Sequence, residues 1–139
     1  MKWYFAGRVR HQPALVEVAR FLESKGEKVN SGWIYEGSLK PYEKNLGKVQ
    51  ALARRVVDSL MQANVFVLIS DPEGTDMFVE LGICLAQKKL REDINIYIVG
   101  EHSKRSLMQL HPDIIHLDNL AAVFDAEKID HQDFNTPIF

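Results

Sequence analysis

The alternation of short apolar runs with segments of helical periodicity limits what this chain can fold into more than any other feature. Residues 64–70 (NVFVLIS) are almost wholly apolar, as expected of a central parallel strand that is covered on both faces. Alternating strands and helices imply right-handed crossovers and a parallel sheet. Five strands are predicted, at 2–6, 28–34 (KVNSGWI), 64–70, 94–99 and 114–117. We therefore predict one α/β domain over residues 1–139, with a doubly wound, five-stranded parallel sheet.

The segments between these strands carry helix signals. Pro13 suits a first helical turn, and Gly26 suits the position just past a helix end. Residues 35–44 show no clear period and are predicted to be a loop, whereas 103–109 and 119–127 are predicted to be short helices. The predicted core positions are Leu15, Val18, Ala19 and Leu22 in the first helix, Val49, Leu52, Ala53, Val56 and Leu60 in the second, and Phe78, Leu81, Gly82 and Leu85 in the third. The pattern favours a flavodoxin/Rossmann-like sheet with strand order 2-1-3-4-5.

Composition narrows the classes of partner. The formal net charge is −2 and the basic residues are scattered, so a nucleic-acid partner is not expected. No apolar run reaches the length of about 18 residues that a membrane span needs, so no membrane partner is expected. The single cysteine, Cys84, excludes an intrachain disulfide and fits a reducing, cytoplasmic location. Residues 129–139 are either a tail that docks on a neighbouring molecule or a frayed end.

The predicted order places a ligand crevice beyond the carboxyl ends of the first and third strands, where the strand order reverses. Residues 6–11, residues 71–80 and the loop after residue 99 surround it. Gly7 and the guanidinium groups of Arg8 and Arg10 have the chemistry of a phosphate site at a strand–helix turn. The same residues also fit an ordinary surface turn.

Glu80 follows the central strand by about one helical turn, and its apolar neighbours place its carboxylate at the edge of the crevice. The alternative is a solvated carboxylate favoured by the helix dipole. Asp71, Gly74 and Asp76 precede it and are candidate binding residues. Beyond the fourth strand, Ser103, Arg105 and Ser106 form a polar segment that suits either a phosphate or plain surface. His111 has no metal-ligand spacing partner, so no metal site is predicted.

Taken together, these segments resemble the nucleoside 2-deoxyribosyltransferase family and its relatives, the deoxynucleoside monophosphate N-glycosidases. The start Tyr4-Phe5-Ala6-Gly7-Arg8-Val9-Arg10 is similar to the family's YFxGSIR, and Ala63-Asn64-Val65-Phe66-Val67-Leu68 is similar to its ADVVVA strand. Phe78-Val79-Glu80-Leu81-Gly82 after Gly74-Thr75 is similar to its GxxYELGxA element. Ser106-Leu107-Met108 and His111-Pro112 resemble the segment after the fourth strand. The resemblance spans about residues 3–125, in the family's order.

The resemblance implies roles for single residues. Glu80 falls on the carboxylate that attacks the anomeric carbon, leaving a covalent glycosyl-enzyme. Tyr4 falls on a residue that orients this nucleophile, and Gly7 and Arg10 fall on sugar-side and phosphate-side contacts. Ser106 falls near a serine that reaches a phosphate across a subunit interface in the glycosidase branch, which implies a homo-oligomer.

Three positions depart from the family pattern. Val56 and Asn64 stand where the family has aspartates, and Arg8 stands where its phosphate-binding branch has serine. Asp58 does not replace the aspartate that is missing at position 56. Two residues along a helix correspond to a rotation of about 200°, which points Asp58 away from the face of Val56. Asp71 or Asp76 remains a candidate for the missing acid. Base departure and 5′-phosphate preference are left open.

Two classes of function follow. One is cleavage or base exchange at the N-glycosidic bond of a (deoxy)nucleoside or its monophosphate, with Glu80 as nucleophile and no cofactor. The other is a non-catalytic domain that binds a nucleotide or sugar phosphate, which Val56 and Asn64 favour. A structural oligomerisation module is a third possibility and needs an exposed apolar surface. Trp33 and Tyr35 are placed to stack on a base at the rim, although a Trp at a strand end also suits packing.

Overall fold

The computed structural model describes residues 1–139 and contains one parallel sheet with strand order β2-β1-β3-β4-β5, which confirms the predicted topology. Neighbouring strands pair in parallel throughout. The strands are β1 (Lys2–Ala6), β2 (Lys28–Val29), β3 (Val65–Ile69), β4 (Asn95–Val99) and β5 (Ile114–Leu117). The helices are α1 (Gln12–Ser24), α2 (Leu46–Gln62), α3 (Asp76–Leu90) and α4 (Leu120–Ala126). Short 3-10 helices span Val9–His11, Gly32–Tyr35, Tyr42–Lys44 and Met108–Leu110.

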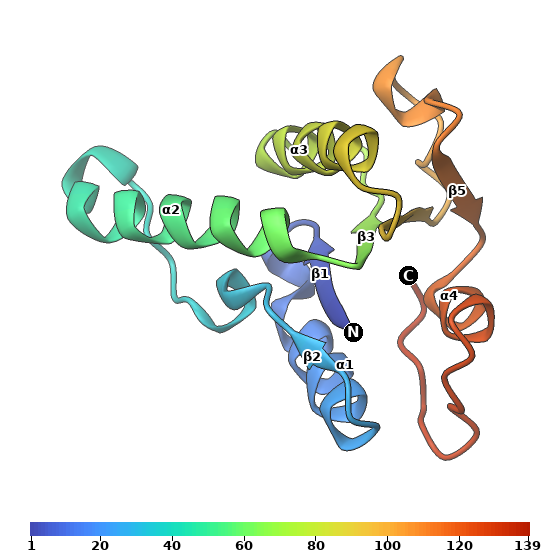
Figure 1. The fold of residues 1–139 in the computed structure, drawn as a ribbon. Coiled ribbons are helices and arrows are strands. Elements are labelled where there is room, and N and C mark those ends of the chain that lie inside the picture. Colours follow the sequence, from blue (N-terminus) through green and yellow to red (C-terminus); the bar gives the residue numbers. More distant parts are fainter.

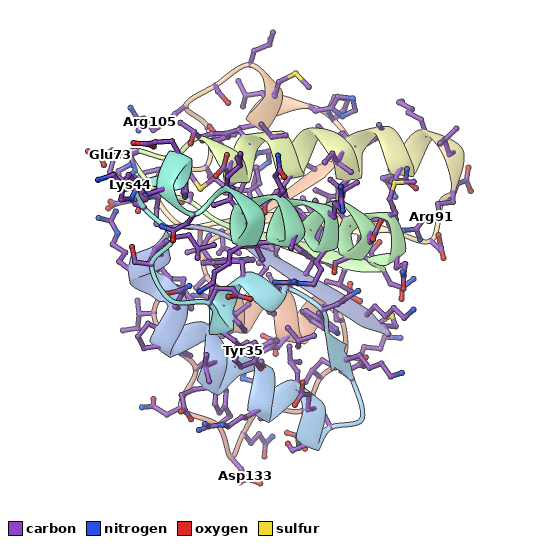
Figure 2. All side chains as sticks on the ribbon, turned by 90° about the vertical axis from the view of Figure 1, so that its left-hand side faces the viewer. Tyr35, Lys44, Glu73, Arg91, Arg105 and Asp133 are labelled. Carbon is purple, nitrogen blue, oxygen red and sulfur yellow. The ribbon has the colours of Figure 1, made fainter.

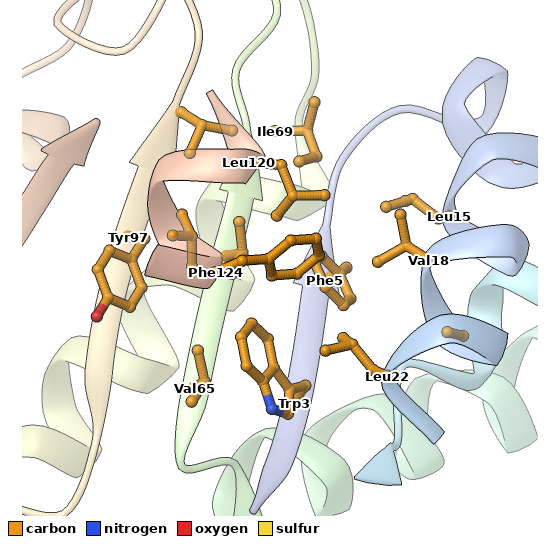
Figure 3. Close-up of a cluster of buried hydrophobic side chains, with 14 of the residues drawn as sticks. Trp3, Phe5, Leu15, Val18, Leu22, Val65, Ile69, Tyr97, Leu120 and Phe124 are labelled. Carbon is orange, nitrogen blue, oxygen red and sulfur yellow. The ribbon is translucent and has the colours of Figure 1, made fainter. Parts of the chain in front are cut away.

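Helices cover both faces of the sheet, with α2 and α3 on one side and α1 and α4 on the other (Figure 1). Side chains alternate along β1, so that Trp3 and Phe5 enter the core under α1 and α4 while Tyr4 and Ala6 face α2 and α3. Figure 3 shows Trp3 and Phe5 between the apolar side chains of α1 and Phe124 of α4. One strand thus anchors both halves of the core.

Helix α1 matches its predicted position. Its four buried residues are the predicted ones, Leu15, Val18, Ala19 and Leu22. Pro13 lies in the first turn, and Gly26, with a φ of +87°, follows the helix end. A positive φ is accessible to glycine without the steric cost that a Cβ brings.

The predicted second strand, 28–34, is wrong beyond Val29. Beyond Val29, side chains of this segment, and not the backbone of a neighbouring strand, bind the N–H and the carbonyl of Phe5 in β1. The Phe5 N–H donates to Ser31 Oγ at 3.2 Å, and the Trp33 indole N–H donates to the Phe5 carbonyl at 2.7 Å. Since these groups are satisfied, the chain leaves the sheet and forms the 3-10 helix Gly32–Tyr35.

The predicted core face of α3 is partly wrong. Leu81 and Leu85 are buried as expected, but Phe78 and Gly82 are only half-buried. The buried face is rotated, so that it includes Glu80. The face predicted for α2 also differs, because Leu60 alone is fully buried along this helix of 17 residues. Val49, Leu52 and Val56 are half-buried and Ala53 is exposed.

Two segments near the C-terminal end also differ from the expectation. The predicted helix 103–109 is a series of turns followed by Met108–Leu110, because the buried Gln109 side chain accepts from the Arg105 N–H at 2.9 Å and donates to the His102 carbonyl at 3.1 Å. The tail 129–139 packs back on its own chain, where Phe134 stacks on Phe21 at 4.2 Å between ring centroids. No helix has the length and apolar character of a membrane span.

Candidate functional site

A crevice lies at the carboxyl ends of β1 and β3, where the order of the strands reverses. One cavity in this crevice has a volume of about 280 Å³. The loop after β1, the segment 33–42 and the first turns of α3 form its walls. This is the position at which doubly wound sheets bind their ligands.

The polar pair at the floor of the cavity joins two elements that are far apart in the sequence. The Tyr4 hydroxyl donates a hydrogen bond of 2.6 Å to Glu80 Oε1. Tyr4 is fully buried and stacks on Phe66, whereas Glu80 is 9% exposed and lines the cavity. The alternation of β1 directs Tyr4 toward α3, and Glu80 lies on the second turn of that helix.

Burial controls the protonation of this pair. It raises the pKa of Glu80 from 4.5 to about 7, and the negative charge of Asp76 adds to the rise while the hydrogen bond from Tyr4 opposes it. Burial and the charge of Glu80 also raise the pKa of Tyr4 far above its ordinary value. The tyrosine therefore stays a hydrogen-bond donor, and Glu80 exchanges its proton near neutral pH.

A second polar cluster surrounds Asp71, directly after β3. The Asp71 carboxylate accepts from Arg10 and from the Glu73 N–H, and Arg8 Nη1 lies 3.8 Å from it. Burial alone would raise the pKa of Asp71, but these hydrogen bonds and cations hold that pKa below its ordinary value. Both arginines expected at a phosphate are therefore engaged with carboxylates, because Arg8 also pairs with Glu73 at 3.0 Å.

The structure brings most of the predicted site residues together. Those that line the crevice are Gly7, Arg8, Trp33, Gly74, Asp76 and Glu80. Tyr4 contacts Glu80 beneath the cavity, while Arg10 and Asp71 are bound to each other beside it. Ser106 lies elsewhere, where its Oγ accepts from the Gln109 N–H at 3.3 Å. Tyr35 is exposed and is absent from the cavity wall.

Segment 35–44, which the sequence indicates only as a loop, supplies much of the wall. Lys40 and Tyr42 line the crevice, and Gln12 holds the segment by donating to the carbonyls of Trp33 at 2.7 Å and Glu36 at 3.0 Å. No periodicity marks these residues. The nearest signal is the aromatic Tyr42 within a polar stretch.

A second cavity, of about 350 Å³, continues from the first between α2 and α3. Glu80 and Asp76 line both cavities. The rest of the second wall is almost entirely apolar and includes Val56. Figure 2 shows Glu73, which lines a pocket next to the first cavity, near Arg105 and on the opposite side of the molecule from Arg91. The structure has no group of three or more His, Cys, Asp or Glu side chains placed to hold a metal ion.

The fold and the crevice define a doubly wound α/β domain with a cavity at the strand switch point. Among solved structures, the CMP N-glycosidase BcmB of Clostridium botulinum has a similar fold, with a TM-score of 0.59 and 15% sequence identity. The similarity covers 94% of this chain and 99% of the other. This similarity confirms the predicted α/β fold. The sequence matches no protein-family model and no curated protein.

Proposed function

We propose that this protein cleaves the N-glycosidic bond of a nucleoside or nucleoside monophosphate, with Glu80 as the nucleophile. The hydrogen-bonded pair of Tyr4 and Glu80 at the floor of a cavity carries the proposal. A carboxylate at this place meets the anomeric carbon of a sugar that enters the crevice. The similar fold of a CMP N-glycosidase supports the same chemistry.

The chemistry follows from the charge that develops at the sugar. As the base departs, C1′ gains oxocarbenium character, and an anionic carboxylate within reach stabilises or traps it. The ester that forms with Glu80 is then attacked by water, which gives hydrolysis, or by a second base, which gives exchange. The Tyr4 hydroxyl donates to Oε1 of Glu80 and so orients the carboxylate, whose other oxygen attacks C1′. We infer that nucleoside 2-deoxyribosyltransferases and related N-glycosidases are the family to which the chain belongs.

The loop after β1 suits the sugar and its 5′ substituent. Gly7 and Arg8 line the crevice, and Arg10 follows at the edge of the cluster around Asp71. A phosphate in this loop would exchange with the carboxylates that now hold the guanidinium groups. Trp33, Gly74 and Asp76 line the space left for the sugar and base.

An assembly of identical subunits is part of the proposal. Helix α2 extends beyond the sheet (Figure 1), and apolar residues along it are open to solvent: Leu46 is 56% exposed and Met61 47%. Val79 of the adjacent α3 is 65% exposed. Exposed apolar side chains on two adjacent helices are typical of an interface. Size-exclusion chromatography with light scattering should give a mass above that of one chain for the wild type and a lower mass for Met61→Glu.

A panel of ribonucleosides, deoxynucleosides and their 5′-monophosphates tests the function, with chromatographic detection of free base. We expect the wild type and a Glu92→Gln control, which changes an exposed carboxylate just after α3, to release base. Glu80→Gln should lose that activity. Equal background release by the wild type and Glu80→Gln would refute the enzyme and leave the non-catalytic binder, which the apolar surroundings of Val56 favour. Tight ligand binding that is unchanged by Glu80→Gln would support the binder.

A further inference from the structure

Breaking the bond from C1′ to a base nitrogen leaves an electron pair on that nitrogen, and a proton donor lowers the barrier for a neutral base. Three carboxylates near the crevice cannot easily take this role, because each is engaged by an arginine. The pairs are Arg10 with Asp71, Arg8 with Glu73 at 3.0 Å, and Arg55 with Glu36 at 2.9 Å. Glu80 itself is needed as the nucleophile. The group that moves the proton must therefore come from elsewhere.

Asp76 is a carboxylate of the crevice that makes no hydrogen bond through its side chain and no ion pair. It begins α3, four residues before Glu80, so the two side chains lie on one helix face with Cβ atoms about 5–6 Å apart. Both line the 280 Å³ cavity and the 350 Å³ cavity. The charge of Asp76 acts on Glu80 and on Tyr4, raising the pKa of both.

A pair of carboxyl groups that line one cavity is also what a retaining glycosidase uses. In such enzymes the nucleophile and the acid–base carboxyl groups lie about 5–5.5 Å apart, close enough for one to attack the sugar while the other serves the leaving group. A substrate that fills the cavity removes water from Asp76 and leaves it beside the Glu80 carboxylate.

We propose that Asp76 is the general acid–base of this site, an inference that rests on the proposed function. In the first step a Glu80 oxygen bonds to C1′, the bond from C1′ to nitrogen breaks, and the nitrogen takes the proton of Asp76. In the second step the Asp76 carboxylate takes a proton from water, whose oxygen bonds to C1′ and displaces Glu80. In the two steps together, the nucleotide and water give free base and sugar phosphate. Asp76 thus supplies from α3 the proton transfer for which the α2 side of the cavity, with Val56, has no carboxylate.

The dependence on the leaving group tests this assignment. Asp76→Asn is compared with the wild type on two substrates that share one sugar: the natural nucleotide cleaved fastest, and a pyridinium nucleotide, whose base departs neutral without receiving a proton. We expect Asp76→Asn to lower kcat by about 10²-fold or more on the natural nucleotide. With the pyridinium nucleotide, the rate of glycosyl-enzyme formation is measured as the burst of free pyridine. This rate should fall by less than about tenfold. Added azide should restore turnover and give the glycosyl azide, because a small anion needs no base to attack the intermediate.

Asp133→Asn is the matched control, since Asp133 is exposed at the end of the molecule away from the crevice (Figure 2). Equal losses on both substrates without azide rescue would show a structural role and overturn the inference, as would full activity of Asp76→Asn on the natural nucleotide. In both cases loss of activity in Glu80→Gln would leave the proposed function standing. Absence of base release by the wild type would overturn the function and this inference together.

Discussion

Replacing Glu80 by glutamine should change how the stability of the fold depends on pH. Burial raises the pKa of the Glu80 carboxyl from 4.5 to about 7. An acid whose pKa is raised by folding binds its proton more tightly in the folded state. The stability that this proton contributes is therefore fully present below about pH 4.5 and is lost as pH rises through about 7.

The size of the effect follows from the two pKa values. At about 1.4 kcal/mol per pKa unit, the rise corresponds to about 3.5 kcal/mol, of which about 2.5 kcal/mol falls between about pH 5 and pH 8. Glutamine keeps an oxygen that accepts the 2.6 Å hydrogen bond from Tyr4, but it does not titrate. We therefore expect the free energy of unfolding of Glu80→Gln, relative to wild type, to rise by about 2–3 kcal/mol across this interval.

Urea unfolding followed by far-UV circular dichroism, at a fixed protein concentration and at intervals between about pH 5 and pH 8, measures this difference. Glu92→Gln, which removes an exposed carboxylate, should follow the wild type in parallel. If Glu80→Gln also stays parallel to the wild type within about 0.5 kcal/mol, the argument from burial is refuted.

Further substitutions test the geometry around the site. Tyr4→Phe removes the hydrogen bond that lowers the pKa of Glu80, so the rise of kcat/KM with pH should move upward by about one pH unit; an unmoved profile would contradict the pairing. Gly74→Ala should lower the free energy of unfolding by about 1–3 kcal/mol in urea, because φ is +123° and a Cβ would lie 2.5 Å from Met77 Cε; a smaller loss than about 0.5 kcal/mol would speak against this conformation. Trp33→Phe leaves a carbonyl of β1 without its 2.7 Å donor and should cost about 1–2 kcal/mol in the same assay, whereas a neutral result would show that water replaces the indole.

The sheet was predictable because its strands are short apolar runs separated by helical periods. The order and the parallel pairing agree with the prediction. The early end of β2 was not predictable from hydrophobicity. It depends on hydrogen bonds between the side chains of Ser31 and Trp33 and the backbone of Phe5 in β1. A hydrophobicity pattern does not indicate which side chain will form the hydrogen bonds that a neighbouring strand would otherwise form.

The candidate site shows the same division. Resemblance to known sequences predicted that Tyr4 and Glu80 lie together, and the two side chains are hydrogen-bonded across 76 positions of sequence. Periodicity alone placed Phe78 in the core face of α3, since it gives no reason to bury a carboxylate. The roles of these residues stay predictions. The partnership of Arg10 with Asp71 could not be inferred either, because each residue alone suits a phosphate or a sugar.

The tyrosine and the glutamate on which the proposed chemistry rests are also part of the packing between the sheet and α3. Repositioning Tyr4 would disturb its stacking on Phe66, so the reacting end of the site and the stability of the fold must change together. The opposite wall is under no such constraint, because segment 35–44 is largely open to solvent. Substitutions that reshape this wall of the cavity can therefore accumulate in that segment while Tyr4 and Glu80 stay fixed.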